Sequence, residues 1–291
     1  MFRVLIVSLA VGNRTWNACF ASLLAAGSAD MGCGLDLAGA AVGGRDGGES
    51  DDAVDDRTVA TDIDAPAAVP DSPDEPGTDS PAAPPPIGFV QIAAATPQTA
   101  TTNISVTYTM AQTAGALDVV VVGWNDTVAQ VTSIGDSSGN LYSRAVGPTT
   151  ESNQLSQSIY YSPNVRAAAA GANAVTVTFS VAAKYADVRV VEYRGIATVN
   201  PLDRTSQANG MTAAASAPAV TTSYSNELIF AAGMTTGTFQ PVAAPFVQRI
   251  ITMPDGDTVE DQIATSLGSY GVTAQQDGAW IMQLATFRSA P

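Results

Sequence analysis

Hydrophobic and polar residues alternate along short segments between residue 87 and the C-terminus, and this alternation predicts β-strands. In NISVTYTM (103–110) every second residue from Ile104 to Met110 is apolar, and the residues between them are polar. AVTVTFS (174–180) repeats the pattern. Strands of this kind belong to a sheet with one face in the core and the other in water.

About a dozen such segments, separated by turn residues, predict an all-β protein. VVVV (119–122) and AWIMQLATF (279–287) are apolar on both faces, which indicates central strands. We therefore expect a two-sheet, jelly-roll-like β-sandwich over residues 87–291. No repeated motif is visible, which disfavours two tandem immunoglobulin-like domains. The predicted strands cover 88–94, 103–110, 117–124, 129–134, 140–146, 155–162, 174–180, 186–193, 217–223, 227–234, 246–253, 265–272 and 279–287.

The first residues have the pattern of a secretory signal peptide. MFRVLIVSLAV begins with a basic residue and continues as an apolar run, and a second apolar run follows at 18–26. Both runs are too short to span a bilayer. Small residues at Gly27 and Ala29 favour cleavage after Ala29, so we assign residues 1–29 to the signal peptide.

Cleavage there would leave a single cysteine, Cys33, in DMGCGLD. This segment resembles the lipidated cysteine of bacterial lipoproteins, although Asp30 stands where such signals carry an apolar residue. Lipidation of Cys33 would make the protein an outer-membrane lipoprotein, with the lipid as its contact with the membrane. The alternative is a freely secreted, extracellular protein with an unpaired thiol.

Residues 30–86 are predicted to be a disordered tether. Residues 45–86 hold 12 Asp and Glu, 2 Arg and 8 Pro, with few large apolar side chains. Such a segment cannot bury enough apolar surface to offset its conformational entropy. Proline and like-charge repulsion keep it extended, which suits a spacer between a surface and a folded domain.

Composition excludes several classes of function. The net charge is −15, of which −10 falls on residues 1–86 and −5 on residues 87–291, so no basic surface for nucleic acid is expected. The chain has no histidine, which excludes a Ser-His-Asp triad and His-ligated zinc. Both cysteines, Cys19 and Cys33, precede the predicted sandwich, which therefore has no disulfide and no cysteine nucleophile.

Five phrases, taken together in this order, resemble a β-sandwich module of bacterial exported and cell-surface proteins. They are GDSSGNLYSRAVGP, VVEYRGI…NPLDRTSQANG, VTTSYSNELIFAAG, PDGDTVEDQ and GSYGVTAQQDGAWIMQLATF. The resemblance covers roughly residues 88–289. It implies a fold and a location outside the cell, and it carries no activity.

PDGDTVEDQ (254–262) concentrates four carboxylates, Asp255, Asp257, Glu260 and Asp261, in a chain otherwise poor in charge. Carboxylates this close repel one another, so a metal cation or an arginine is expected nearby. The segment lacks the EF-hand order, but adjacent loops of a β-sandwich can form a structural calcium site. The alternative is a solvated turn with local hydrogen bonds, which we favour.

Three other features are candidates for chemistry. DSSGN (136–140) places oxygen atoms at alternate positions, as cation loops do, but is also a good turn sequence. Glu192 shares a parity with Val188 and Val190, so it should face the core and need a partner, for which we propose Arg204 in a structural ion pair. Trp124 and Trp280 lie in apolar strands and are expected to pack in the core. The weaker candidates for sugar-stacking surfaces are Tyr142, Tyr160, Tyr161, Tyr193 and Tyr270.

Together these features favour a noncatalytic exported module that binds a cell-surface glycan or protein. One alternative is a glycoside hydrolase or lyase that uses two carboxylates such as Glu192 and Glu260, which requires them roughly 5–9.5 Å apart across a cleft. Another is a purely structural surface domain without a ligand. No catalytic residue is assigned, and calcium is the one cofactor considered.

Overall fold

The computed structural model describes residues 85–291, which belong to one compact unit and form antiparallel β-sheets. Cys33, the predicted signal peptide and most of the predicted tether lie outside the described residues. No helix long and apolar enough to cross a membrane occurs within 85–291. The strands are β1 (Gly88–Ala95), β2 (Thr101–Thr107), β3 (Leu117–Trp124), β4 (Val131–Asp136), β5 (Ser143–Glu151), β6 (Leu155–Ser162), β7 (Ala174–Ala183), β8 (Asp187–Arg194), β9 (Leu202–Gly210), β10 (Ala214–Thr221), β11 (Glu227–Thr235), β12 (Val247–Ile251), β13 (Thr258–Ala264), β14 (Ser269–Gln275) and β15 (Trp280–Arg288).

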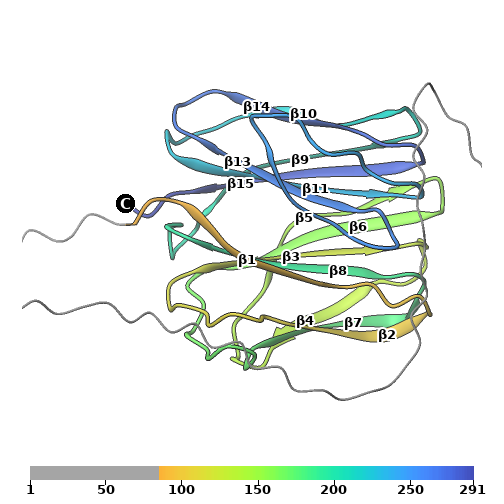
Figure 1. Ribbon diagram of the computed structural model, residues 1–291, viewed down its shortest axis with the longest axis horizontal. Helices are drawn as coiled ribbons and strands as arrows, with labels where there is room; N and C mark the ends of the chain where they lie inside the picture. Colours follow the sequence, from red (N-terminus) through yellow and green to blue (C-terminus); the bar gives the residue numbers. More distant parts are fainter. Residues whose placement is uncertain (1–84) are drawn as a thin grey trace, which may run out of the picture. The chain divides into compact units, whose positions relative to one another are not determined.

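The all-β sandwich predicted from the sequence is confirmed, but it has four sheets rather than two. From the lower edge of Figure 1 to the upper edge, the layers are β2-β7-β4, then β1-β8-β3-β6-β5, then β12-β13-β11-β15-β9, then β10-β14. The two five-stranded sheets are the inner layers. Their central strands are buried on both faces and therefore need a covering layer on each side, which a two-sheet sandwich cannot supply.

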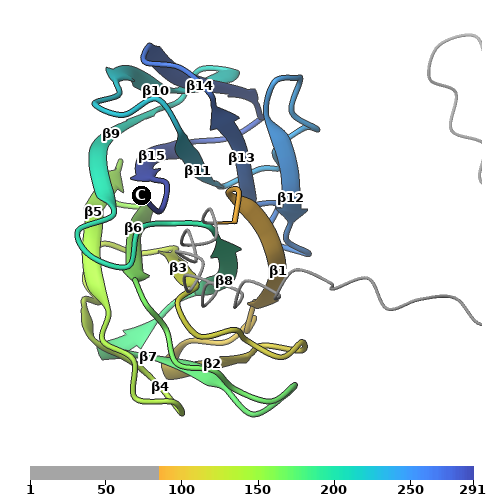
Figure 2. The same ribbon diagram turned by 90° about the vertical axis from the view of Figure 1, so that its left-hand side faces the viewer.

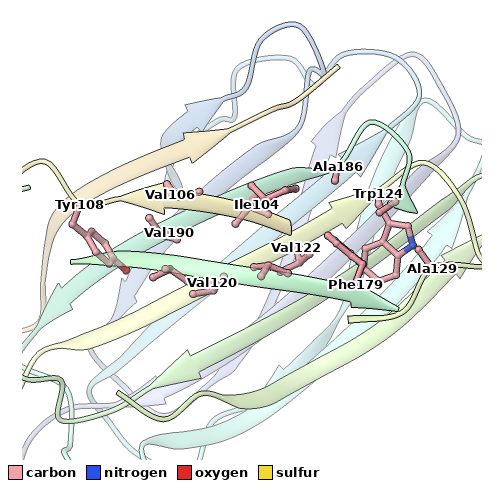
Figure 3. Packing of buried hydrophobic residues seen from close by; sticks show 14 residues of the cluster. Ile104, Val106, Tyr108, Val120, Val122, Trp124, Ala129, Phe179, Ala186 and Val190 are labelled. Atoms are coloured by element: carbon pink, nitrogen blue, oxygen red, sulfur yellow. The ribbon is translucent and has the colours of Figure 1, made fainter. Parts of the chain in front are cut away.

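Three apolar clusters lie between the successive layers. The first lies between the β2-β7-β4 sheet and the inner sheet of β3 and β8, and Figure 3 shows it ending at Trp124, whose ring meets Phe179 edge to face at a centroid distance of 5.5 Å. The second joins the two inner sheets through residues such as Val121 and Phe230. The third lies beneath β10 and β14. Each fully buried aliphatic side chain contributes about 1.5–3 kcal/mol.

The strand order of the first half is repeated in the second half. The inner sheet β1-β8-β3-β6-β5 corresponds strand by strand to β9-β15-β11-β13-β12, and the pair β2-β7 corresponds to β10-β14. The second half has no strand equivalent to β4. The segment 236–246 occupies the position of β4 in the chain order of the second half. Phe239 in this segment is buried, and its ring packs against Gly233. The repeat was not visible in the sequence because it lies in strand order and not in residue identity.

The two halves are joined along both sides of the inner layers, as the end-on view of Figure 2 shows. On one side β5 lies against β9, and the Asn209 amide donates to the Thr150 carbonyl oxygen at 2.8 Å. On the other side the Arg249 guanidinium of β12 lies 4.3 Å from the centroid of the Phe89 ring in β1. These contacts fix the two halves against each other.

Candidate functional site

The segment PDGDTVEDQ does not form a single acidic site. Residues 253–255 are a turn, Gly256 and Asp257 follow it, and 258–262 belong to β13. The alternation of the strand sends Glu260 and Asp261 to opposite faces. Within residues 85–291 no group of three acidic or cysteine side chains could hold a metal ion. The proposed calcium cage of Asp255, Asp257, Glu260 and Asp261 is therefore not supported by the geometry.

The favoured alternative, a solvated turn, is also wrong for three of the four carboxylates. Asp257, Glu260 and Asp261 are 1, 0 and 1 % exposed. Asp261 is paired with Arg249, whose Nε and Nη2 donate to its two oxygens at 2.7 and 2.8 Å, and it also accepts the Tyr193 hydroxyl at 2.5 Å. The sequence pattern did not predict β13, because a carboxylate stands on each of its two faces, Glu260 on one and Asp261 on the other.

A second cation near the acidic segment is Arg189 of β8, which the sequence analysis did not name. Its Nε lies 2.9 Å from Asp187, and its Nη2 lies 3.8 Å from Asp257. Its Nη1 donates to the carbonyl oxygens of Gly233 and Thr258, at 2.9 and 2.8 Å. Arg189 is fully buried and belongs to the first half, so this side chain ties the second half to the first.

Glu192 faces the core, as its parity predicted, but it is not paired with Arg204. The Gln91 amide donates to Glu192 at 2.6 Å, and the neighbouring carboxyl group across the strand pair is Asp118. Arg204 lies 3.8 Å from Asp203 and donates to Ser223, on the exposed surface of the second half. The predicted ion pair is wrong because it was drawn between two residues close in sequence, whereas β1 and β3 flank β8 in the sheet.

Asp118 and Glu192 form a buried carboxyl pair enclosed by amides and hydroxyls. Gln112 donates to both Asp118 oxygens at 2.9 and 3.2 Å, and the Tyr142 hydroxyl bridges Asp118 and Asp136 at 3.2 and 3.0 Å. Burial raises the pKa of Asp118 to about 7, and the charge of Glu192 adds to that effect. DSSGN forms the predicted turn, in which the Asn140 backbone N–H donates to the Asp136 carboxylate at 2.9 Å. None of the four hollows described for residues 85–291 is lined by Asp118 or Glu192.

A different site lies at the end of the sandwich where β3, β11 and β15 meet loops, which we call the far end. Residues 85–87 and the C-terminus lie together at the opposite end, the left-hand side of Figure 1. At the far end a hollow of ≈ 200 Å³ opens between the two halves. The first half contributes Asn125 and Tyr185 to its lining; the second contributes Thr235, Thr236, Gly237, Pro254 and Asp255.

Tyr185 is the most distinctive residue on this hollow. It sits in the turn between β7 and β8, is 49 % exposed and has a φ of 43°. A left-handed backbone is strained for a bulky residue, and such strain persists where the surrounding structure holds it. Asp126 supplies that support, because it accepts the backbone N–H of Lys184 at 3.0 Å and of Ala129 at 2.8 Å.

The hollow presents an aromatic face beside polar groups. Within residues 85–291 neither the Asn125 amide nor the Tyr185 hydroxyl makes a hydrogen bond, so both are free to contact a ligand. The Asp255 Oδ1 accepts the Gln98 amide at 2.8 Å, whereas its Oδ2 is buried and has no hydrogen-bond donor within residues 85–291. Burial raises the pKa of this carboxyl. Sequence reasoning missed Tyr185. The signal available for it was an aromatic residue inside a turn, AAKYAD, next to the single lysine of the chain.

The expected core positions of Trp124 and Trp280 are confirmed, at 1 and 5 % exposed, so neither is a stacking surface. Among the tyrosines named from the sequence, Tyr193 is fully buried and Tyr142 is bound to carboxylates. The far-end hollow is therefore the candidate site. Comparison of the chain with family models, with curated proteins and with solved structures gives no match, so any functional inference rests on the geometry described above.

Proposed function

We propose that this chain is a noncatalytic exported module whose far-end hollow binds a glycan. The observation that carries the proposal is Tyr185, a half-exposed aromatic ring held in a strained conformation on the rim of a polar hollow. An aromatic face packs against the C–H face of a sugar ring, while amide, hydroxyl and carboxylate groups bind its hydroxyls.

The position of the hollow supports the same function. The described chain begins at the end opposite the hollow. A tether attached at residue 85 would therefore hold the binding face away from the surface to which it is fixed. The proposal includes export by the signal peptide at residues 1–29 and anchoring through a lipid on Cys33, both of which rest on the sequence.

Catalysis lacks comparable support. Hydrolysis of a glycoside requires two carboxyl groups roughly 5–9.5 Å apart on one cleft. Each of the four hollows described for residues 85–291 is lined by at most one carboxylate. Glu192 and Glu260, the pair considered from the sequence, belong to strands of different halves. We therefore do not propose a hydrolase.

Glycan binding is tested with an array of uncharged and acidic glycans, using the wild-type chain, Tyr185→Ala and Tyr224→Ala. Tyr224 is a matched control, because it is 44 % exposed and lies at the opposite end. We expect wild type and Tyr224→Ala to retain the same glycans and Tyr185→Ala to lose them, with equal thermal stability for all three. Equal binding by Tyr185→Ala, or no binding by wild type, would overturn the proposal. An arm with a chelator tests calcium, and we expect no change.

Anchoring is tested separately by mass spectrometry of the membrane fraction from the native host. A lipid-modified Cys33 at the new N-terminus is the expected result. An unmodified thiol there would exclude the anchor and leave free secretion, without bearing on the glycan site.

A further inference from the structure

A second hollow lies beside the first at the far end, and the two together suit a ligand that neither would hold alone. The second measures ≈ 430 Å³ and is lined by Met211, Ala213 and the loop 276–279 that joins β14 to β15. The first, at ≈ 200 Å³, is smaller than the roughly 300–1,000 Å³ usual for small-ligand sites. A compact ligand confined to the first hollow would therefore be only partly enclosed.

The ridge between the two hollows is held by hydrogen bonds between its two loops. Thr236, on the first hollow, donates its N–H to the Ala279 carbonyl oxygen at 2.9 Å, and the Ala279 N–H donates back to the Thr236 hydroxyl at 3.0 Å. Gly237 and Gly278 meet at the same place, where any side chain would collide with the opposite loop. The side chains at the ridge are small and polar: the Thr236 hydroxyl and the Asp277 carboxylate, which accepts the Thr238 N–H at 2.6 Å. A chain molecule that crosses from one hollow to the other would therefore meet backbone and hydrogen-bonding groups.

The charge of the two hollows restricts the ligand further. Each contributes one carboxylate, Asp255 in the first and Asp277 in the second, and neither is lined by lysine or arginine. An acidic polymer would be repelled at both positions, whereas the hydroxyls of a neutral sugar can donate to carboxylates. Met211, 71 % exposed on the rim of the second hollow, offers a flexible apolar contact.

We infer that the far end binds an extended, uncharged glycan that crosses the ridge at Gly237 and Gly278, with sugar residues in both hollows. This inference rests on the proposed function and deepens it, because it assigns the ligand a length and a charge. Tyr185 would hold one sugar unit and the surface around Met211 another.

The test is a calorimetric titration of uncharged gluco-, manno- and xylo-oligosaccharides of two to six units, with a hexuronic acid oligomer as the acidic comparison. The variants are Met211→Arg, which fills and blocks the second hollow, and Leu141→Arg at the opposite end as a control. Leu141 is 85 % exposed, so both arginines replace surface side chains.

For the wild type and Leu141→Arg, we expect the dissociation constant of one series to fall about tenfold or more between two and six units. Met211→Arg should bind the disaccharide with the affinity of the wild type, but its affinity should not increase with the length of the oligosaccharide. The acidic oligomer should not bind to any of the three proteins. Tyr185-dependent binding that is independent of length, or unaffected by Met211→Arg, would overturn the two-hollow inference alone. Absence of binding at every length would overturn the proposed function as well.

Discussion

At the scale of single residues, this protein buries charged side chains in a segment that the sequence predicted to be a solvated turn. Asp257, Glu260 and Asp261 are buried, and so is Arg189, the cation that approaches Asp257. Buried charges are stable when they are paired, and Asp261 meets that condition through Arg249. Glu260 does not, because neither of its oxygens has a hydrogen-bond partner within residues 85–291. The contrast leads to two predictions.

The first concerns Glu260, which faces the third core cluster opposite Ala231. Burial raises the pKa of Glu260 from 4.5 to about 7, with the charge of Asp261 as the smaller cause. The folded protein therefore holds this proton more tightly than the unfolded chain does. This tighter binding of the proton stabilises the fold fully below pH 4.5, and the stabilisation is lost as the pH rises to about 7. Above that pH the free energy of unfolding should be lower by about 3 kcal/mol.

Glu260→Met removes this ionisation while keeping a side chain of similar length. Urea unfolding at pH 4 and pH 8 should show the variant gaining stability over wild type at the higher pH. Asp118 also titrates near pH 7 but is present in both proteins, so its contribution cancels in the difference. The same pH dependence in both proteins would contradict the assignment.

The second prediction concerns Arg189. Arg189→Met leaves the carboxylates of Asp187 and Asp257 buried without their cation, and it removes the bonds to the Gly233 and Thr258 carbonyls. We expect the free energy of unfolding to fall by about 3–5 kcal/mol. Arg204→Met is the control, since its side chain is 53 % exposed and its ion pair is worth at most about 1 kcal/mol. Equal effects of the two substitutions in chemical denaturation would refute the role given to Arg189.

At the scale of elements, strands were predictable where one face is apolar. β3, β7 and β11 coincide with predicted segments to within a few residues. β9 and β13 were missed because their residues are polar, LDRTSQANG and TVEDQIA, and only their neighbours in the sheet make them strands. The missing equivalent of β4 was also invisible, since the segment 236–246 closes the core with one aromatic ring instead of a strand.

Because the Phe239 ring packs directly against Gly233, we expect the stability of the fold to be sensitive to a larger residue at position 233. A methyl group added there would collide with the Phe239 ring, so Gly233→Ala should lower the free energy of unfolding by about 1–3 kcal/mol. Adding Phe239→Leu should return part of that loss. Gly135 of β4 has no atom within 4 Å of the corresponding position, so Gly135→Ala should stay within about 0.5 kcal/mol of wild type. Thermal and urea unfolding measure all four proteins, and a harmless Gly233→Ala would show that Phe239 does not fill this position tightly.

At the scale of the whole molecule, the two halves share a core. The second cluster takes side chains from both inner sheets, and Arg189 and Arg249 connect the halves at its edges. Neither inner sheet could cover its second face without the other. The repeated strand order therefore builds one folding unit and not two independent domains.

This predicts that both halves unfold in a single transition. Trp124 reports on the first core cluster and Trp280 on the third, and Trp16 can be replaced by phenylalanine so that each reports alone. In single-tryptophan variants, urea midpoints from fluorescence should agree with each other and with circular dichroism. Two separate midpoints would mean that the halves unfold independently.

The sequence alone determined the all-β class, the central strands and the burial of alternating residues, because these depend on periodicity within single segments. It also showed the acidic segment and the need for a cation near it. Tertiary structure alone decided which cation that is, where each carboxylate points and how many layers form. It also brought Tyr185 and Asp255, 70 residues apart in the chain, to the rim of one hollow. Those outcomes depend on pairing between distant strands, for which local pattern carries no signal.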